Sequence, residues 1–334
     1  MKKNFKRREF IKKAGLAGAA ATAISSFPAP AIAAGHQEWI ICSAFGKAGL
    51  LGQAIQAFAE GINNYSEKLK IKVYHAGELV PGLESLDAVR SGAAQASYGA
   101  PYYWTNLSDA IEFVATCPFG MNAMEQNAWC YYGGGIEAAD EIYNGLGLKF
   151  LPMGNTGNQM GGWFNKEINT PSDYQGLKMR MPGLGGRTIE KLGATPVLLA
   201  GPDVLPSLAS GAVDAAEWIC PAADLGAGLY QAAKYYYGPG WHEPSTLLDL
   251  SMDLKAWESL DSATQGLITD MTKSFNMSVF SRFQAINGPA LQKLTGEHGV
   301  TIKTFPDEVL IALGNAAGEV VSERGSINSE TKAI

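Results

Sequence analysis

Three short stretches of this chain carry the residues that could do chemistry. In the run 154–164, asparagine and glutamine amides, which donate and accept hydrogen bonds, alternate with glycines that let the backbone approach a bound molecule. Arg180 stands alone in the second stretch, and Glu217 is followed by Trp218 in the third. Amides, one guanidinium and one carboxylate are groups that can hold a small carboxylate together with a cation. The first run contains no cysteine, serine or histidine, so we expect binding rather than covalent catalysis.

The spacing of apolar residues predicts the elements that position these stretches. Strands and helices alternate in the first part of the chain, at 39–43 (strand), 50–62 (helix), 69–74 (strand), a helix ending near 92, and 94–99 (strand). This order is typical of a mainly parallel sheet covered by helices. Ligands bind outside the strand ends of such sheets, and Arg180, Glu217 and Tyr103 all fall near predicted strand ends.

The later part of the chain predicts a second set of elements. Strands are expected at 148–153, 160–164, 177–181 and 195–199, with helices over 186–192 and over much of the chain beyond 254. The segment 86–96 also recurs, weakly, as 205–215, and both copies read as helix, glycine, then strand. Gly92 and Gly211 stand where a left-handed helix end is expected. This internal repeat indicates two lobes of similar structure.

The N-terminus has the pattern of an export signal. Arg7 and Arg8 lie in a basic stretch, the apolar segment 14–24 follows, and 31–33 reads as a small-x-small cleavage site. We therefore expect 1–34 to be a twin-arginine signal peptide. The apolar segment is too short to anchor the chain, so we predict a soluble periplasmic protein without direct membrane insertion.

Charge and length narrow the possible partners. The first 34 of 334 residues hold seven Lys or Arg against one Glu, so the rest carries 19 basic and 31 acidic residues, a net charge of −12. Such a surface argues against a nucleic-acid partner. It also means that local groups must hold any anionic ligand. The remaining 300 or so residues suffice for two lobes with buried cores.

The four cysteines do not form a metal-binding pattern. Cys42, Cys117, Cys130 and Cys220 are far apart and make no Cys-x-x-Cys pair, which removes the spacing support for zinc or iron-sulfur sites. One or two disulfides are possible in an oxidising compartment, but the favoured interpretation is four small buried side chains.

Five segments carry a resemblance to a known family, namely 75–82, 132–136, 154–164, 176–180 and 216–218. With them, the chain resembles the extracytoplasmic solute-binding subunits of tripartite ATP-independent periplasmic (TRAP) transporters, the DctP-like superfamily, in the branch that binds 2-oxo acids and lactate. The resemblance runs from about Trp39 to the end of the chain. Its members usually continue further and add helix, so the sequence leaves open whether this chain is a fragment of a longer gene product.

The resemblance implies an α/β, periplasmic-binding-protein-like fold. Two α/β lobes, joined by crossing strands and a long helix, would enclose a ligand in the cleft between them. We expect lobe I over 36–124 plus 216–250 and lobe II over 125–215 plus 251–334. The protein would not be an enzyme; it would capture a small 2-oxo or 2-hydroxy monocarboxylate and deliver it to the small and large membrane subunits.

The family's binding residues carry over to positions in this sequence. The carboxylate-binding arginine matches Arg180, whose planar guanidinium can make two parallel bonds to one carboxylate. Asn155 and Tyr103 match positions of polar contacts. The cation ligands match Gln159, Glu217, the backbone carbonyl of Trp218 and Glu243. Oxygen ligands suit sodium or calcium, with Gln159 near both cation and substrate.

Several alternatives remain at this stage. Arg180 could form a surface salt bridge, and the aromatic row 102–104 could be plain packing. A zinc hydrolase is disfavoured because His242 lacks a second histidine and Pro244 would break the helix, so we expect His242 in a loop or at the rim. The glycine-rich stretches 133–135 and 183–188 do not fit phosphate loops. The rival functions are an exported cofactor-bearing redox enzyme and a ligand-presenting sensor.

Overall fold

The computed structural model describes residues 35–334. The predicted signal peptide therefore lies outside the described residues. Within them, no helix has both the length and the apolar character needed to cross a membrane.

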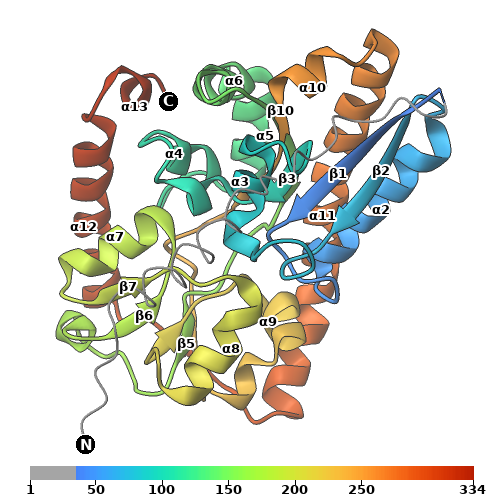
Figure 1. Cartoon of the computed structure of the whole chain (residues 1–334). Coiled ribbons are helices and arrows are strands. Elements are labelled where there is room, and N and C mark those ends of the chain that lie inside the picture. Colours follow the sequence, from blue (N-terminus) through green and yellow to red (C-terminus); the bar gives the residue numbers. More distant parts are fainter. Residues whose placement is uncertain (1–34) are drawn as a thin grey trace, which may run out of the picture. The chain divides into compact units, whose positions relative to one another are not determined.

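The first sheet has five strands in the order β2-β1-β3-β10-β4 (Figure 1). Its strands are β1 (Gln37–Ser43), β2 (Leu69–Tyr74), β3 (Ala96–Gly99), β4 (Leu148–Asn155) and β10 (Leu247–Asp253). β1 runs parallel to β2 and β3, whereas β10 is antiparallel to both of its neighbours. The predicted mainly parallel arrangement therefore holds for the three N-terminal strands and is interrupted by β10.

The second sheet has six strands in the order β11-β9-β5-β8-β6-β7. They are β5 (Gly162–Phe164), β6 (Lys178–Arg180), β7 (Thr195–Val197), β8 (Ala215–Ala216), β9 (Tyr235–Gly238) and β11 (Thr301–Thr304). β6 is parallel to β7 and β8, and β5 is antiparallel to β8 and β9. The mixed α/β architecture with two sheets confirms the predicted fold class.

Helices cover both sheets. The α-helices are α2 (Leu50–Tyr65), α3 (Ser85–Arg90), α4 (Ile111–Ala115), α5 (Ala123–Tyr132), α6 (Gly135–Gly145), α7 (Gly183–Lys191), α8 (Gly201–Ser210), α9 (Pro221–Ala227), α10 (Leu254–Glu258), α11 (Ser262–Gly296), α12 (Asp307–Gly325) and α13 (Ser329–Ala333). Short 3₁₀ helices are η1 (Gly82–Glu84), η2 (Pro101–Trp104), η3 (Pro171–Tyr174) and η4 (Leu229–Gln231). The 35-residue α11 contacts α2 and β4 at the first sheet and α9 beside the second, as a long connecting helix should.

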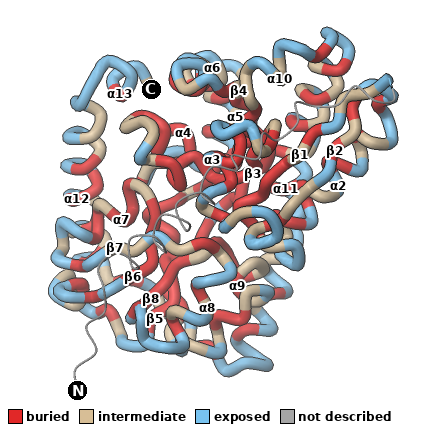
Figure 2. Tube along the Cα trace, in the orientation of Figure 1, coloured by how far each residue is buried: buried red, intermediate tan, exposed pale blue. Residues whose placement is uncertain are grey.

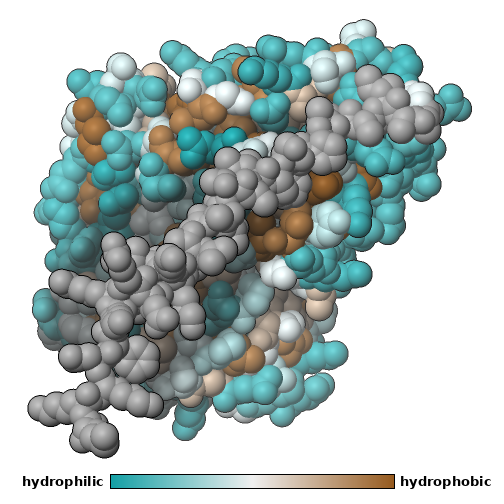
Figure 3. Space-filling model, viewed as in Figure 1, coloured by the Kyte–Doolittle hydropathy of each residue, from teal (hydrophilic) through white to brown (hydrophobic). Residues whose placement is uncertain are grey.

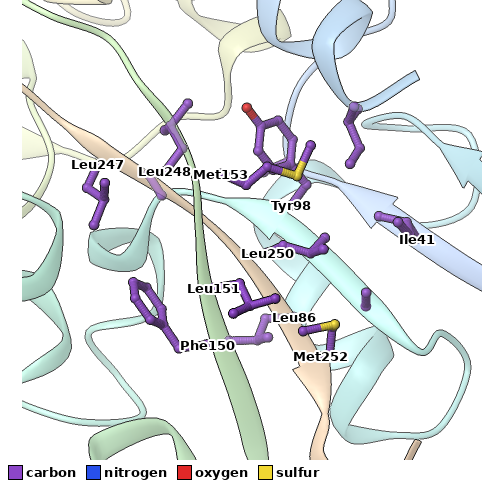
Figure 4. Packing of buried hydrophobic residues seen from close by; sticks show 14 of the residues in the cluster. Ile41, Leu86, Tyr98, Phe150, Leu151, Met153, Leu247, Leu248, Leu250 and Met252 are labelled. Atoms are coloured by element: carbon purple, nitrogen blue, oxygen red, sulfur yellow. The ribbon is translucent and has the colours of Figure 1, made fainter. Parts of the chain in front are cut away.

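Strand periodicity explains how the cores form. On the second sheet, Trp163 packs on one face with Tyr236, and its neighbour Phe164 packs on the other face with Tyr237. Successive side chains of a strand point to opposite faces, so two apolar neighbours supply two separate clusters. The first sheet has one larger core, in which strand residues such as Leu250 and Leu151 pack together (Figure 4).

Burial follows the strands and the inner faces of the helices (Figure 2). On α2, for example, Leu51, Ile55, Phe58 and Ile62 are buried at helical spacing. The surface seen in Figure 3 is largely hydrophilic, with hydrophobic residues in separate patches. All four cysteines are unpaired; three are buried and Cys117 is half-buried, close to the favoured interpretation.

The chain passes between the two sheets three times: along two short crossing segments, 156–161 between β4 and β5 and 239–246 between β9 and β10, and through α10 and α11 between β10 and β11. Sheet membership differs from the predicted lobe ranges at two strands. β4 pairs with β10 in the first sheet, and β9 pairs between β5 and β11 in the second. β9 is short and rich in tyrosine, so its sequence shows no alternation of apolar and polar residues from which a strand could be predicted. The full extent of the lobes stays a prediction.

The two copies of the internal repeat form the same local structure, a helix followed by a strand. α3 and β3 form the first copy, and α8 and β8 form the second. Gly92 and Gly211 both adopt positive φ, at 78° and 74°. The left-handed helix end expected at each glycine is confirmed.

Candidate functional site

Arg180 is the buried cation at the centre of the candidate site. It ends β6, and only 1% of its surface is exposed. Its Nη1 donates to the carbonyl oxygen of Glu217 (3.0 Å) and to the Glu217 carboxylate, and its Nε donates to the carbonyl of Leu199 (3.3 Å). Its Nη2 has no hydrogen-bond partner among the residues described. A surface salt bridge is therefore excluded for Arg180, and one buried donor stays free.

Strand register brings Glu217 to this arginine. β6 and β8 pair in parallel with Arg180 opposite Ala216, so Glu217 follows directly past the strand end. Its carboxylate is buried and contacts Arg180 on one oxygen and His242 Nε2 on the other, at 3.2 Å. Burial lowers the pKa of His242, but the hydrogen bond and charge of Glu217 outweigh burial and raise it overall.

Glu243 supplies a second buried carboxylate. Its Oε2 accepts hydrogen bonds from Gln159 Nε2 (2.7 Å), from Tyr102 Oη (3.3 Å) and from the hydroxyl of Thr246. Burial, and next the negative charge of Glu217, raise the pKa of Glu243 to about 7. Two carboxylates this close repel each other, so the site favours a bound cation or proton.

Gln159 joins the two crossing segments. Its Nε2 donates to Glu243, to Thr246 Oγ1 (2.9 Å) and to Thr156 Oγ1 (3.1 Å). The backbones also meet here, because Gly240 N donates to the carbonyl of Gln159, and a Cβ on Gly240 would lie 2.3 Å from that oxygen. Gln159 Oε1, in contrast, has no partner in the described part of the chain. A buried amide oxygen is left free beside two carboxylates.

Three aromatic residues surround the cluster. Tyr102 and Tyr103 lie on η2, which follows β3 of the first sheet, and both are buried. Burial raises the pKa of Tyr103 to about 12, while the nearby Arg180 opposes the shift. The Trp218 ring lies 5.2 Å from the guanidinium carbon of Arg180, a cation-π distance. The first sheet thus contributes tyrosines, and the second contributes the charged pair.

Asn155 lies at the end of β4 and is fully buried, but its amide already has partners within the protein. Its Nδ2 donates to Gln126 Oε1 (2.9 Å), and its Oδ1 accepts from Gly157 N (2.8 Å). Thr156, the next residue, hydrogen-bonds to the segment that carries Glu243. Both polar atoms of the Asn155 side chain are therefore already used within the protein.

The donor set fits a hard cation. One ligand atom each from Glu217, His242 and Glu243 lies within 4.8 Å of the others. The unpartnered Gln159 Oε1 adds an amide oxygen, so oxygens dominate the cluster. Sodium and calcium prefer oxygen ligands, whereas zinc would favour more nitrogen or sulfur. His242 Nε2 is already engaged by Glu217, which makes the histidine a support for that carboxylate.

Sequence reasoning missed three contributors to this cluster. His242 was expected in a loop or at the rim; it is on a connecting segment but is completely buried. Tyr102 was weighed only as packing, yet it donates to Glu243. Thr246 was not considered. A polar run 242–246 ahead of a buried strand was the available signal, since such polar side chains need partners when buried.

Comparison with known proteins yields consistent matches. Residues 45–326 match the model of the family described as bacterial extracellular solute-binding protein, family 7. The chain is 37% identical to a monocarboxylate 2-oxoacid-binding periplasmic protein of Nostoc sp. PCC 7120, over 98% of this chain and 92% of that protein.

Two solved structures are similar at the level of both sequence and fold. One is a TRAP periplasmic solute-binding protein from Pseudoalteromonas atlantica T6c with bound sodium and pyruvate: 37% identity, TM-score 0.86, covering 89% of this chain and 91% of that one. The other, from Colwellia psychrerythraea, has bound calcium and pyruvate: 36% identity, TM-score 0.86, with coverage of 89% and 92%.

Proposed function

The chain belongs to family 7 of the bacterial extracellular solute-binding proteins, and from this premise we propose that it captures a small 2-oxo or 2-hydroxy monocarboxylate with a sodium or calcium ion. Members of this family are solute-binding receptors rather than enzymes. One of the relatives named above is a 2-oxoacid-binding protein, and two have pyruvate bound together with sodium or calcium. The observation that carries the proposal is the pair of free polar atoms, Arg180 Nη2 and Gln159 Oε1, in one buried charged cluster.

Arg180 would hold the ligand carboxylate. Its free Nη2 and the neighbouring Nη1 can donate two parallel hydrogen bonds once Nη1 exchanges the Glu217 carboxylate for the ligand. The net charge of the chain beyond residue 34 is negative, so a local guanidinium must supply the attraction. Tyr103, beside Arg180, would add a polar contact, and Asn155 would do so after releasing Gln126 or Gly157.

The cation would sit among Gln159 Oε1, the carboxylates of Glu217 and Glu243, and the backbone carbonyl of Trp218. When bound, the ion supplies a positive contact that the carboxylate and the 2-oxo or 2-hydroxy oxygen of the ligand can share. It also offsets the repulsion between the two buried glutamates. Gln159 would orient the ligand as well, because it lies on the crossing segment between β4 and β5 and its amide contacts Glu243.

The two sheets would act as the cores of two lobes that close on the ligand. Tyr102 and Tyr103 come from the first sheet's side and Arg180 and Glu217 from the second, so a bound ligand would be contacted from both. Closure excludes water, which strengthens the Arg180 contact. The lobe ranges predicted from sequence would then change at β4 and β9, which follow their sheets.

We place this protein in the periplasm, exported by a twin-arginine signal in residues 1–34. There it would deliver its ligand to the small and large membrane subunits of a TRAP transporter. The support is the extracytoplasmic family and the TRAP proteins among its structural relatives.

Titration calorimetry tests the proposal directly. The protein, stripped of ions with a chelator, would be titrated with pyruvate, lactate and 4-methyl-2-oxopentanoate in buffers with potassium only, with sodium, or with calcium. We expect binding with sodium or calcium and much weaker binding with potassium alone. Acetate is the control, because it has the carboxylate but not the second oxygen. If acetate and pyruvate bound with equal affinity, the site would not recognise the 2-oxo oxygen in addition to the carboxylate, and the proposal would be contradicted.

A further inference from the structure

A buried aspartate on α9 holds the segment that follows Glu217. Asp224 has 1% of its surface exposed, and its carboxylate accepts hydrogen bonds on both oxygens. Oδ2 accepts from Trp163 Nε1 (2.9 Å) on β5 and from Tyr236 Oη (2.7 Å) on β9, and these two rings stack at 4.0 Å. Oδ1 accepts from the backbone N–H of Ile219 (3.0 Å). Asp224 therefore joins two strands of the second sheet to the segment after β8.

The hydrogen bond from Ile219 to Asp224 acts on a peptide unit that also contains the Trp218 carbonyl. The C=O of Trp218 and the N–H of Ile219 belong to one peptide bond, which is trans. Because a trans peptide is planar, these two groups point in opposite directions. Holding the N–H toward Asp224 therefore sets the direction of the carbonyl oxygen, which is one of the proposed cation ligands.

Backbone contacts hold the segment on both sides of this peptide. Before it, the N–H of Glu217 donates to the carbonyl of Arg180 (3.1 Å). After it, the carbonyl of Ile219 accepts from the N–H of Met160 (3.0 Å) on the first crossing segment. These bonds fix the two ends of the segment to the rest of the site. The bond to Asp224 fixes the peptide between them.

The charge of Asp224 adds to this geometric effect. Burial raises the pKa of Asp224 to about 6, while the hydrogen bonds from Trp163, Tyr236 and Ile219 oppose that rise, so the group is a carboxylate at neutral pH. A carboxylate that accepts from a peptide N–H polarises the peptide and makes its carbonyl oxygen more negative. A more negative oxygen is a better ligand for a hard cation such as sodium or calcium.

We propose that Asp224 is a positioning residue for the cation, because its bond to the Ile219 N–H directs and polarises the Trp218 carbonyl that binds the ion. The inference rests on the proposed function, since it requires a cation held by that carbonyl. Asp224 does not touch the ion, and its two oxygens are used by Trp163, Tyr236 and Ile219. Partners of this kind, one bond removed from a metal, typically change metal affinity by roughly tenfold to a hundredfold.

The test separates the charge of Asp224 from the stability of its surroundings. Asp224→Asn keeps the size of the side chain and removes the charge. Tyr236→Phe is the matched control, because it removes a hydrogen bond on Oδ2, keeps the stacked ring, and leaves the Ile219 bond on Oδ1 intact. Circular dichroism shows whether each variant is folded, and urea unfolding measures how much stability it loses.

Calorimetry with pyruvate gives the Kd in the potassium, sodium and calcium buffers defined above, at pH 8, where Asp224 is ionised. The ratio of the Kd in potassium to the Kd in sodium or calcium measures the contribution of the cation. A general loss of stability weakens binding in every buffer and leaves the ratio unchanged. We expect Asp224→Asn to lower this ratio roughly tenfold or more, and Tyr236→Phe to lower it less than about threefold.

A measurement on the wild type decides the question if Asp224→Asn does not fold. In the ¹⁵N–¹H NMR spectrum, adding sodium or calcium to the ion-free protein should move the Ile219 amide proton downfield. The ion withdraws charge from the carbonyl of the same peptide, which makes the N–H a stronger donor to Asp224. The Lys178 amide is the matched control, because it donates to Asp214 Oδ2 at 2.9 Å, and its proton should move less.

The outcomes separate this inference from the function on which it rests. If the wild type binds pyruvate with a cation but the two variants lower the ratio equally, or neither lowers it, Asp224 is a structural anchor and the proposed function stands. An Ile219 amide proton that moves no further than that of Lys178 overturns the inference as well. If pyruvate binding to the wild type does not depend on the cation, the proposed cation site and this inference both fail.

Discussion

Two regions of this molecule bury a glutamate against arginine, and they differ in how completely their polar atoms are used. In the candidate site, Glu217 contacts Arg180 and His242, while Arg180 Nη2 and His242 Nδ1 are left without partners among residues 35–334. In the second region, Glu112 of α4 accepts from Arg187 Nε (3.2 Å) on one oxygen and from Arg324 Nε (2.7 Å) on the other.

The second region is a closed network. Glu112 has no exposed side-chain surface, and Arg324 also donates to Asp109 at 2.7 Å. It joins α4, near the first sheet, to α7 and α12, near the second. Buried charge and arginine pairing therefore occur in both regions and cannot by themselves identify a binding site. The free buried donors and acceptors make the difference, since leaving them unpaired costs stability unless a ligand uses them.

The largest expected effect comes from removing one arginine from each region. Arg180→Ala should weaken binding of the 2-oxo acid by a hundredfold or more, because it removes the charge that faces the ligand and leaves Glu217 with His242 as its one remaining side-chain partner among the described residues. Arg187→Ala, which removes one partner of Glu112, should change the Kd less than about fivefold. Calorimetry on both folded variants measures the difference. Comparable losses in the two variants would falsify the distinction between the regions.

A buried carboxylate outside both regions, with no arginine among its hydrogen-bond partners in the described residues, sharpens the comparison. Asp249 of β10 is fully buried, accepts from Tyr143 Oη (2.9 Å) and from the Ser251 hydroxyl, and leaves Oδ1 unpartnered in the described structure. Burial raises the pKa of Asp249 from its ordinary 3.8 to about 7. With its pKa raised to about 7, the carboxyl group of Asp249 holds its proton in the folded state at pH values where an exposed aspartate has lost it.

The sign of the pH effect follows from that shift. Between pH 4 and 7 the unfolded chain loses this proton while the folded chain retains it, so folding stability falls as pH rises and levels off above pH 7. Asp249→Asn should remove on the order of 2–4 kcal/mol of this decline. Urea unfolding of both proteins at several pH values measures it. An unchanged pH dependence in the variant would mean that Asp249 is ionised in the fold.

The closed network should matter more for stability than for binding. Glu112→Gln keeps the shape but removes the charged acceptor of Arg187 and leaves Arg324 with Asp109 alone, which should lower the free energy of unfolding by about 1–3 kcal/mol. Ligand affinity should fall only a few fold, through the lost link between the sheets. Denaturant titration and calorimetry on the same sample give both values. A larger loss in affinity than in stability would assign Glu112 to the binding machinery.

The elements that could be predicted from the sequence are those with long, regular patterns. The α2 face and the strands β1 and β2 follow directly from apolar spacing, and the glycine ends at 92 and 211 follow from backbone conformation. β9 and β11 are four residues each, with tyrosines or alternating polar residues, so their pairing depends on neighbours remote in sequence.

The site was predictable only in part for a related reason. The role expected for Arg180 came from family resemblance, and its burial follows from its place on an apolar strand. The hydrogen bonds of Tyr102 and His242 instead depend on two crossing segments meeting, which no local pattern contains. Whether a buried polar atom is free or satisfied is likewise a tertiary property.

A last comparison separates two buried glutamines. Gln126 is fully used, because its Nε2 donates to the carbonyl of Ala115 and its Oε1 accepts from Asn155 and Ser245. Gln159 has a free Oε1 beside the two glutamates. If that oxygen binds the cation, Gln159→Leu should weaken 2-oxo acid binding about tenfold and reduce its dependence on sodium or calcium.

Gln126→Leu is the matched substitution at the satisfied position. It should lower stability by leaving its partners unpaired, yet preserve the ratio of affinities measured with and without the cation. Calorimetry in sodium and in potassium buffers gives that ratio. A general loss of packing weakens binding in both buffers by the same factor, so it leaves the ratio unchanged. If the ratio falls equally in the two variants, the free oxygen of Gln159 does not hold the ion. Arg180 Nη2 would then be the one unpartnered atom of this pair that contributes to ligand binding.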